Sequence, residues 1–142
     1  MVTLADLFDP ALLSLMVREG YVRVQQHPSA PLVIHNYTEK AQYESVWNEV
    51  TLTCRGLISA PDGTIVARPY PKFFNHGQPG APELGLDARV RVTDKADGSL
   101  GVVHFDGTGY AVATRGSFAS EQALHATALL RDRYAGWTPR PG

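Results

Sequence analysis

Pairs of short apolar segments joined by Asp-Gly turns limit the fold of this chain more than any other feature. Residues 54–59 and 64–68 are rich in apolar and β-branched side chains. They flank Ala60-Pro61-Asp62-Gly63, where the proline presets the bend and the Asp-Gly pair supplies the residue that tolerates a positive φ. This pattern predicts an antiparallel β-hairpin.

A second group of strands is predicted later in the chain. Its members are residues 88–93, 100–105 and 110–114, which are apolar and β-branched. The turn sequences Lys95-Ala-Asp-Gly-Ser99 and Asp106-Gly-Thr-Gly109 join them. The residues between the two groups are rich in proline and glycine, which exclude an inner strand and predict a loop.

Helices and two further strands complete the predicted elements. Apolar side chains at helical spacing predict a cover helix near the N-terminus and another helix near the C-terminus. The predicted elements are a helix ending at Gly20, strands at residues 21–24 and 32–37, a short helix capped by Thr38 that runs through Trp47, and a helix from Ser120. The predicted fold class is therefore α+β, with antiparallel β-hairpins and flanking helices.

The composition is that of a soluble globular protein with one domain. The chain has 142 residues, of which 44% are hydrophobic and 19% charged. Its 13 basic and 14 acidic residues leave a formal net charge of -1, so any site for a polyanion has to be local. The apolar runs are far shorter than the roughly 20 residues of a membrane span. With a single cysteine, Cys54, and no secretory signal, we expect a cytoplasmic protein without a membrane partner.

The segment around Lys95 has residues suited to covalent chemistry. A lysine at the end of a predicted strand is followed by Asp97 and Gly98. Because a lysine with its ordinary pKa of about 10.4 is protonated at neutral pH, burial or neighbouring cations must deprotonate it before it can act as a nucleophile. Gly98 permits a tight turn close to a phosphate, and Asp97 can orient the amine. Taken alone, these residues fit a surface turn with a solvated lysine better than they fit a catalytic site.

Several separate segments match one protein family in the same order along the chain. They are His35-Asn36-Tyr37, Cys54-Arg55-Gly56-Leu57-Ile58, Pro71-Lys72-Phe73-Phe74-Asn75, Lys95-Ala-Asp97-Gly98-Ser99-Leu100 and Thr114-Arg115-Gly116-Ser117. In these segments the chain resembles the bacteriophage T4 type of ATP-dependent RNA ligase. That family lies within the superfamily of lysine nucleotidyltransferases, which includes DNA ligases and mRNA capping enzymes.

The resemblance implies a reaction in three steps. A lysine attacks the α-phosphate of ATP to form lysyl-AMP, the AMP moves to an RNA 5′-phosphate, and a 3′-hydroxyl then displaces it. The residues implied are Lys95 and Asp97 for catalysis, and Tyr37, Arg55, Lys72, Gly98 and Arg115 for the nucleotide. The implied cofactors are ATP and Mg²⁺, with no metal ligand assigned in this chain. The implied partners are RNA ends, with tRNA as one candidate, in a repair pathway.

Each residue of this set also has an ordinary structural interpretation. Arg55 fits a surface ion pair beside a hairpin, and Lys72 fits a solvated loop base beside two buried phenylalanines. Tyr37 fits a core residue with its hydroxyl at the rim, and Arg115 a solvated charge at a strand end. The neighbouring His35 is a further candidate for the lining of the pocket, but the histidines lack metal-ligand spacing. A non-catalytic module that binds nucleotide or RNA ends, and a purely structural fragment, therefore remain alternative functions.

The resemblance also bears on domain organisation. It implies that residues 1–142 form a single domain, the N-terminal part of an adenylyltransferase domain. The family's glutamate-bearing strand, its acidic metal-binding segment and its pair of phosphate-gripping lysines have no counterpart in this sequence. Exposed strand edges recruit other strands. We therefore expect self-association, or a second polypeptide that completes the domain.

Overall fold

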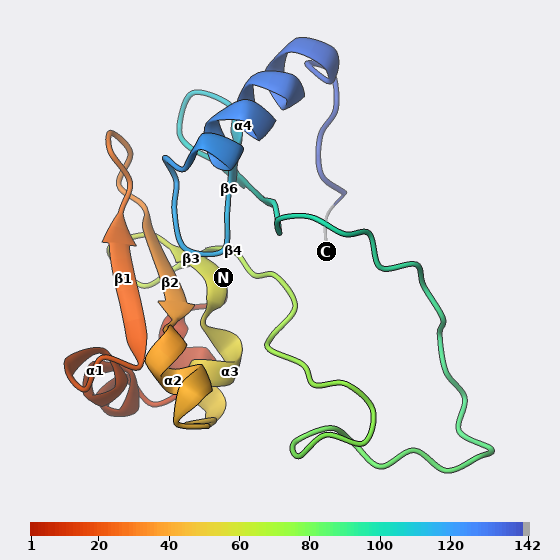
Figure 1. Cartoon of the computed structure of the whole chain (residues 1–142). Coiled ribbons are helices and arrows are strands. Elements are labelled where there is room, and N and C mark those ends of the chain that lie inside the picture. Colours follow the sequence, from red (N-terminus) through yellow and green to blue (C-terminus); the bar gives the residue numbers. More distant parts are fainter. Residues whose placement is uncertain (141–142) are drawn as a thin grey trace.

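The computed structural model describes residues 1–140 and contains two antiparallel β-sheets with helices around them (Figure 1). The first sheet has the strand order β1-β2-β3-β4 and the second consists of β5 and β6. The strands are β1 (Val22–Gln26), β2 (Val33–Tyr37), β3 (Arg55–Ser59), β4 (Ile65–Ala67), β5 (Val102–Phe105) and β6 (Tyr110–Ala113). The predicted α+β class with antiparallel hairpins is confirmed.

Polar side chains cap the helices at their N-termini. The helices are the 3₁₀ turn η1 (Leu4–Asp6) and the α-helices α1 (Pro10–Arg18), α2 (Glu39–Tyr43), α3 (Glu49–Thr53) and α4 (Glu121–Arg133). The predicted N-terminal helix is divided into two because Pro10 has no N–H to donate, so it begins α1 after the cap Asp9. The predicted short helix capped by Thr38 is confirmed as α2, but its predicted end at Trp47 was wrong, because α2 ends at Tyr43 and a separate helix follows.

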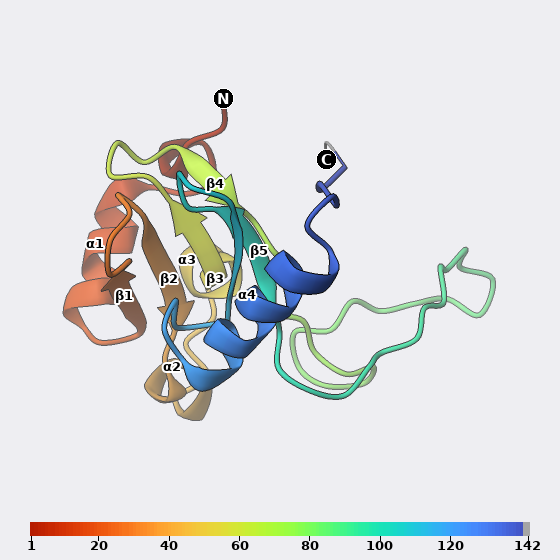
Figure 2. The same ribbon diagram turned by 90° about the horizontal axis from the view of Figure 1, so that it is seen from above.

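Two apolar cores lie on opposite faces of the first sheet. On β3, Leu57 belongs to the core shared with α1 and α3, and the adjacent Ile58 belongs to the core shared with the second sheet. Successive side chains of a strand point to opposite faces, so both faces of the sheet are covered. Figure 2 shows α1 and α4 on opposite sides of this sheet. Helix α4 is tied to β6 through Thr127, whose hydroxyl bonds both the N–H and the carbonyl of Val112.

The predicted strand at residues 88–93 was wrong. The chain leaves the body after β4, passes through an irregular and largely exposed segment, and returns to form β5 (Figures 1 and 2). Val90 and Val92 are 62% and 88% exposed there. Alternating apolar side chains make a strand only when a neighbouring strand accepts the backbone hydrogen bonds, and none lies alongside within residues 1–140. Lys95 therefore lies on an exposed segment and not at the end of a strand.

Candidate functional site

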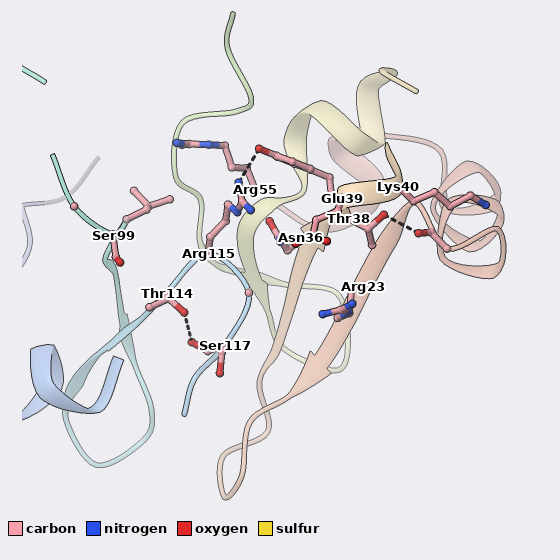
Figure 3. A pocket seen from close by; sticks show the side chains of 15 residues that line it. Arg23, Asn36, Thr38, Glu39, Lys40, Arg55, Ser99, Thr114, Arg115 and Ser117 are labelled. Carbon is pink, nitrogen blue, oxygen red and sulfur yellow. Dashed lines mark hydrogen bonds between the residues drawn. The ribbon is translucent and has the colours of Figure 1, made fainter. Parts of the chain in front are cut away.

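A cleft of about 760 Å³ opens where the two sheets meet. Side chains from the end of β2, the start of β3, the turn after β6 and the segment before β5 border it (Figure 3). Of the residues predicted for the site, the cleft brings together Tyr37, Arg55, Gly98 and Arg115. These residues are distant in sequence, so the convergence is a product of the fold.

The lining of the cleft is locally basic. It includes Arg23, Lys40, Arg55 and Arg115, with Glu39 as its one acidic side chain among the described residues. None of these four cations forms an ion pair with a carboxylate within residues 1–140. A chain with a net charge of -1 thus has a local site suited to an anion.

Arg115 is held against Tyr37. Its Nη1 donates a hydrogen bond of 2.8 Å to the Tyr37 hydroxyl, and its guanidinium carbon lies 4.8 Å from the centroid of the same ring. Tyr37 is only 4% exposed, so it is both a core residue and a member of the cleft wall. The interpretation of Tyr37 as a core residue is confirmed, and its position in the wall leaves its role in nucleotide binding a prediction.

Gly56 lets the Arg115 backbone approach. Its φ is +83°, and a Cβ built there would lie 3.3 Å from both Cα and the carbonyl oxygen of Arg115. A larger residue would meet a left-handed backbone conformation and a rigid neighbour together. Both residues of the Arg-Gly pair on β3 therefore contribute to the cleft. Arg55 lines it, and Gly56 leaves room for the backbone of Arg115.

Arg55 is not in the surface ion pair that its alternative interpretation required. Its Nη1 donates to the carbonyl of Tyr70 at 3.2 Å, and its guanidinium carbon lies 5.3 Å from the Phe73 ring centroid. These contacts connect β3 to the start of the irregular segment. No carboxylate within residues 1–140 pairs with Arg55, so its positive charge can act on a ligand in the cleft.

Lys72 lies outside the lining of the cleft. Its backbone N–H donates to the Leu52 carbonyl at 2.8 Å, which attaches the irregular segment to the end of α3. Its Nζ donates to the carbonyl of Phe73 at 2.7 Å. The expected pair of buried phenylalanines was wrong, because Phe73 is 53% exposed, whereas Phe74 is half-buried. Lys72 itself is half-buried rather than solvated.

Lys95 and Asp97 also lie outside the cleft lining. Lys95 Nζ is 3.9 Å from Asp97 Oδ1, and their side chains are 77% and 105% exposed. Gly98, Ser99 and Leu100, the residues that follow directly, do line the cleft. The predicted nucleophile is thus three residues from the cleft lining in the sequence, and its side chain is in solvent.

The predicted site set did not include several polar residues of the lining, among them Arg23, Asn36 and Lys40. Arg23 and Lys40 are exposed charges whose proximity to the cleft depends on long-range strand pairing, and no local signal marks them. Lys40 donates to the Glu19 carbonyl at 2.8 Å and points away from Arg115 (Figure 3). Asn36 lay within a matched segment, and its Oδ1 is buried without a hydrogen-bond partner among the described residues.

His35 and Cys54 are buried and lie outside the cleft lining. The expectation that His35 borders the pocket was wrong, because its side chain is 5% exposed and its Nε2 lies 3.0 Å from Ser59 Oγ. Burial lowers the pKa of His35 to about 4 and raises the pKa of Cys54 to about 12. Both groups are therefore neutral near pH 7.

Within residues 1–140, no group of three or more His, Cys, Asp or Glu side chains is placed to hold a metal ion. No helix in this part of the chain combines the length and apolar character needed to cross a membrane.

Comparison with known proteins gives a family match and a relative. A family model described as RNA ligase matches residues 53–135, a range that contains Arg55, Lys72, Lys95 and Arg115. RNA ligase 1 of Bacteriophage TS2126 is 38% identical over 71 residues, which cover 44% of this chain and 18% of that protein. The chain therefore aligns with less than a fifth of the length of this relative.

Proposed function

This chain belongs to the bacteriophage T4 type family of RNA ligases, and from that premise we propose that its cleft binds ATP for the adenylylation of Lys95. The observation that carries the proposal is the convergence of Arg55, Arg115 and Gly98 in one cleft whose cations lack carboxylate partners within residues 1–140. A triphosphate is the kind of ligand that such unpaired cations stabilise.

The residues of the cleft have different proposed roles in binding the nucleotide. Arg55 and Arg115 are the proposed phosphate contacts, because a guanidinium presents several N–H donors in a plane. Gly98 allows the backbone to approach a phosphate closely, since no Cβ lies in the way. Tyr37 holds Arg115 in place through the hydrogen bond and ring contact described above.

Lys95 is the proposed nucleophile. After its Nζ loses a proton to water, the lone pair attacks the α-phosphorus, an N–P bond forms, and the bond to the leaving oxygen of pyrophosphate breaks. Asp97, which is already 3.9 Å from Nζ, is the proposed orienting group. The Lys95 side chain must turn from solvent into the cleft before this step. Cations beside the transferred phosphoryl group would stabilise the charge of the transition state.

The later steps of ligation are also proposals for this chain. We propose RNA 5′-phosphate and 3′-hydroxyl ends as the substrates, with tRNA as one candidate and repair as the process, in the cytoplasm. Mg²⁺ would neutralise phosphate charge when bound. The single domain proposed here is the N-terminal part of an adenylyltransferase domain.

Intact-protein mass spectrometry tests the adenylylation. We expect the chain incubated with ATP and Mg²⁺ to gain the mass of one AMP, and Lys95→Ala to gain none. Because trypsin does not cleave after a modified lysine, the adduct should appear on a peptide spanning residues 92–115. An adduct that persists in Lys95→Ala, or maps to Lys40 or Lys72, would refute the assignment of the nucleophile.

A non-catalytic role in binding nucleotide or RNA ends is a second candidate, favoured by one observation. The cleft has its arginines in place while Lys95 remains in solvent. Binding without adenylylation would persist in Lys95→Ala and would weaken as salt is raised. Mass spectrometry without an adduct, together with salt-sensitive ATP binding in both proteins, would select this role.

We propose in addition that the irregular segment is covered by a second copy of the chain or by another polypeptide. Its exposed apolar side chains include Tyr70 at 84%, Leu86 at 110% and Val92 at 88%. Burial of such side chains against a partner would remove their apolar surface from water.

A further inference from the structure

Trp47 connects the wall of the cleft to the irregular segment. Its ring meets Tyr37 edge to face, with centroids 5.2 Å apart and an interplanar angle of 83°. It meets Phe74 in the same manner at 5.6 Å and 79°. Offset edge contacts of this kind are the favourable geometry for aromatic pairs. Tyr37, Trp47 and Phe74 thus form a continuous aromatic row.

A cation lies at each end of the aromatic row. The Arg115 guanidinium carbon is 4.8 Å from the Tyr37 centroid at one end. At the other end, Lys72 Nζ is 4.4 Å from the Phe74 centroid and 5.6 Å from the Trp47 centroid. Aromatic faces attract cations through the ring quadrupole. The row therefore relates the position of Lys72 to that of Arg115.

The backbone before Trp47 is held in an unusual conformation. Ser45 has a φ of 55°, the one positive value for a residue other than glycine in residues 1–140. The next two N–H groups are bonded, from Val46 to the Ala41 carbonyl at 2.9 Å and from Trp47 to the Ser45 carbonyl at 3.1 Å. Strained conformations persist where the surrounding contacts fix them, and they concentrate at functional positions. The turn at Ser45 directly precedes Trp47 and directs its ring toward Tyr37.

Lys72 depends on these rings for its placement. Its backbone is attached to Leu52, but its Nζ has only the carbonyl of Phe73 as a polar partner and forms no ion pair within residues 1–140. The Phe73 carbonyl belongs to the residue next to Lys72, so it does not fix the amine relative to another part of the chain. The Trp47 ring comes from a different part of the chain and packs on Phe74, so this ring pair links the amine to the wall of the cleft.

We propose that Trp47 is a positioning residue that holds Lys72 in line with the Tyr37–Arg115 wall, so that two cations approach one anionic ligand together. This inference rests on the proposed nucleotide function of the cleft. It assigns to Trp47 a role that neither the sequence motifs nor the lining of the cleft indicated. Removing the ring would release Lys72 and leave Arg115 in place.

Lysine side-chain NMR tests the placement without any ligand. In the full chain labelled with ¹³C-lysine, ring currents should shift the ε-methylene protons of Lys72 upfield of those of the solvated Lys95. Trp47→Leu keeps an apolar side chain and removes the ring. A released Lys72 leaves the Phe74 ring as well, so its signal should reach that of Lys95. The matched control Trp137→Leu removes the other tryptophan, which is 45% exposed, and should leave Lys72 unmoved. A Lys72 signal that stays upfield of Lys95 in Trp47→Leu, as contact with Phe74 alone would give, would overturn the proposal.

Equilibrium dialysis with labelled ATP tests the consequence for binding. Trp47→Leu should weaken ATP binding by about fivefold to tenfold, the loss expected for a displaced cation, and Trp47→Phe should restore most of it. Unchanged affinity in Trp47→Leu would overturn the positioning role even if Lys72 moves. Absence of ATP binding by the unmodified chain would refute the proposed function instead, and the NMR result alone would then decide whether Trp47 places Lys72.

Discussion

Replacing Gly56 by alanine should damage the fold more than the same change at another glycine with the same backbone conformation. Gly56 and Gly63 have φ values of +83° and +87°. An L-residue in this region costs about 1–2 kcal/mol, so both substitutions carry that strain. At Gly63 nothing lies within 4 Å of an added Cβ, whereas at Gly56 the Cβ meets Arg115 Cα, Arg115 O and Val102 Cγ2, each at 3.3 Å. Two of these neighbours are backbone atoms and cannot rotate away.

Overpacking of a rigid site costs about 1–3 kcal/mol, so we expect Gly56→Ala to lower the free energy of unfolding by roughly 2–5 kcal/mol. Gly63→Ala should lower it by only about 1–2 kcal/mol. Urea denaturation followed by circular dichroism measures both on matched samples. Because the displaced backbone carries Arg115, ATP binding by the folded fraction should fall in Gly56→Ala and hold in Gly63→Ala. Equal loss of stability in the two variants would refute the close approach of Arg115 as the reason for this glycine.

Two further predictions concern buried and exposed groups. Burial lowers the pKa of His35 to about 4, while the unfolded chain takes up a proton near pH 6.5, so stability should fall as the pH decreases between these values, by up to about 3 kcal/mol. Urea titrations at pH 7.5 and 4.5 measure this loss, and a His35→Gln variant with an undiminished loss would contradict it. The exposed apolar side chains of the irregular segment predict self-association, so the sedimentation coefficient should rise with protein concentration. One concentration-independent value for a monomer would count against it.

Local signals predicted those elements whose partners are close in sequence. The hairpin of β3 and β4 forms because its turn residues act on adjacent segments, and the Ala60 N–H reaches the Thr64 carbonyl at 2.8 Å. Helix α3 was missed because Val50, Thr51 and Thr53 favour a strand, while the cap at Asn48 and the packing of Val50 in the core favour the helix. Tertiary contacts decided this element against its local propensity.

The difference between local signals and tertiary contacts also explains which site residues the fold brings together. Tyr37, Arg55 and Arg115 lie at the ends of paired strands or just after them, so sheet registry places them at the cleft. Lys72, Lys95 and Asp97 lie on the segment without a strand partner. A motif match does not indicate how far such a side chain lies from the cleft. Arg23 and Asn36 join the cleft because β1 pairs with β2, with the two residues in direct register. No short sequence motif records such a pairing.

The position of Lys95 outside the cleft is compatible with its proposed chemistry because of where the irregular segment is attached. Gly98 already lines the cleft, and three peptide units span at most about 10 Å. The Lys95 backbone is therefore never far from the lining, and its four-carbon stem extends the reach of the amine further. Gly98 has a φ of +131° and nothing within 4 Å of a built Cβ, so the chain can rotate there without a clash. Turning the amine inward thus requires rotation over residues 95–98 and leaves the sheets, the aromatic row and the Arg115 anchor in place.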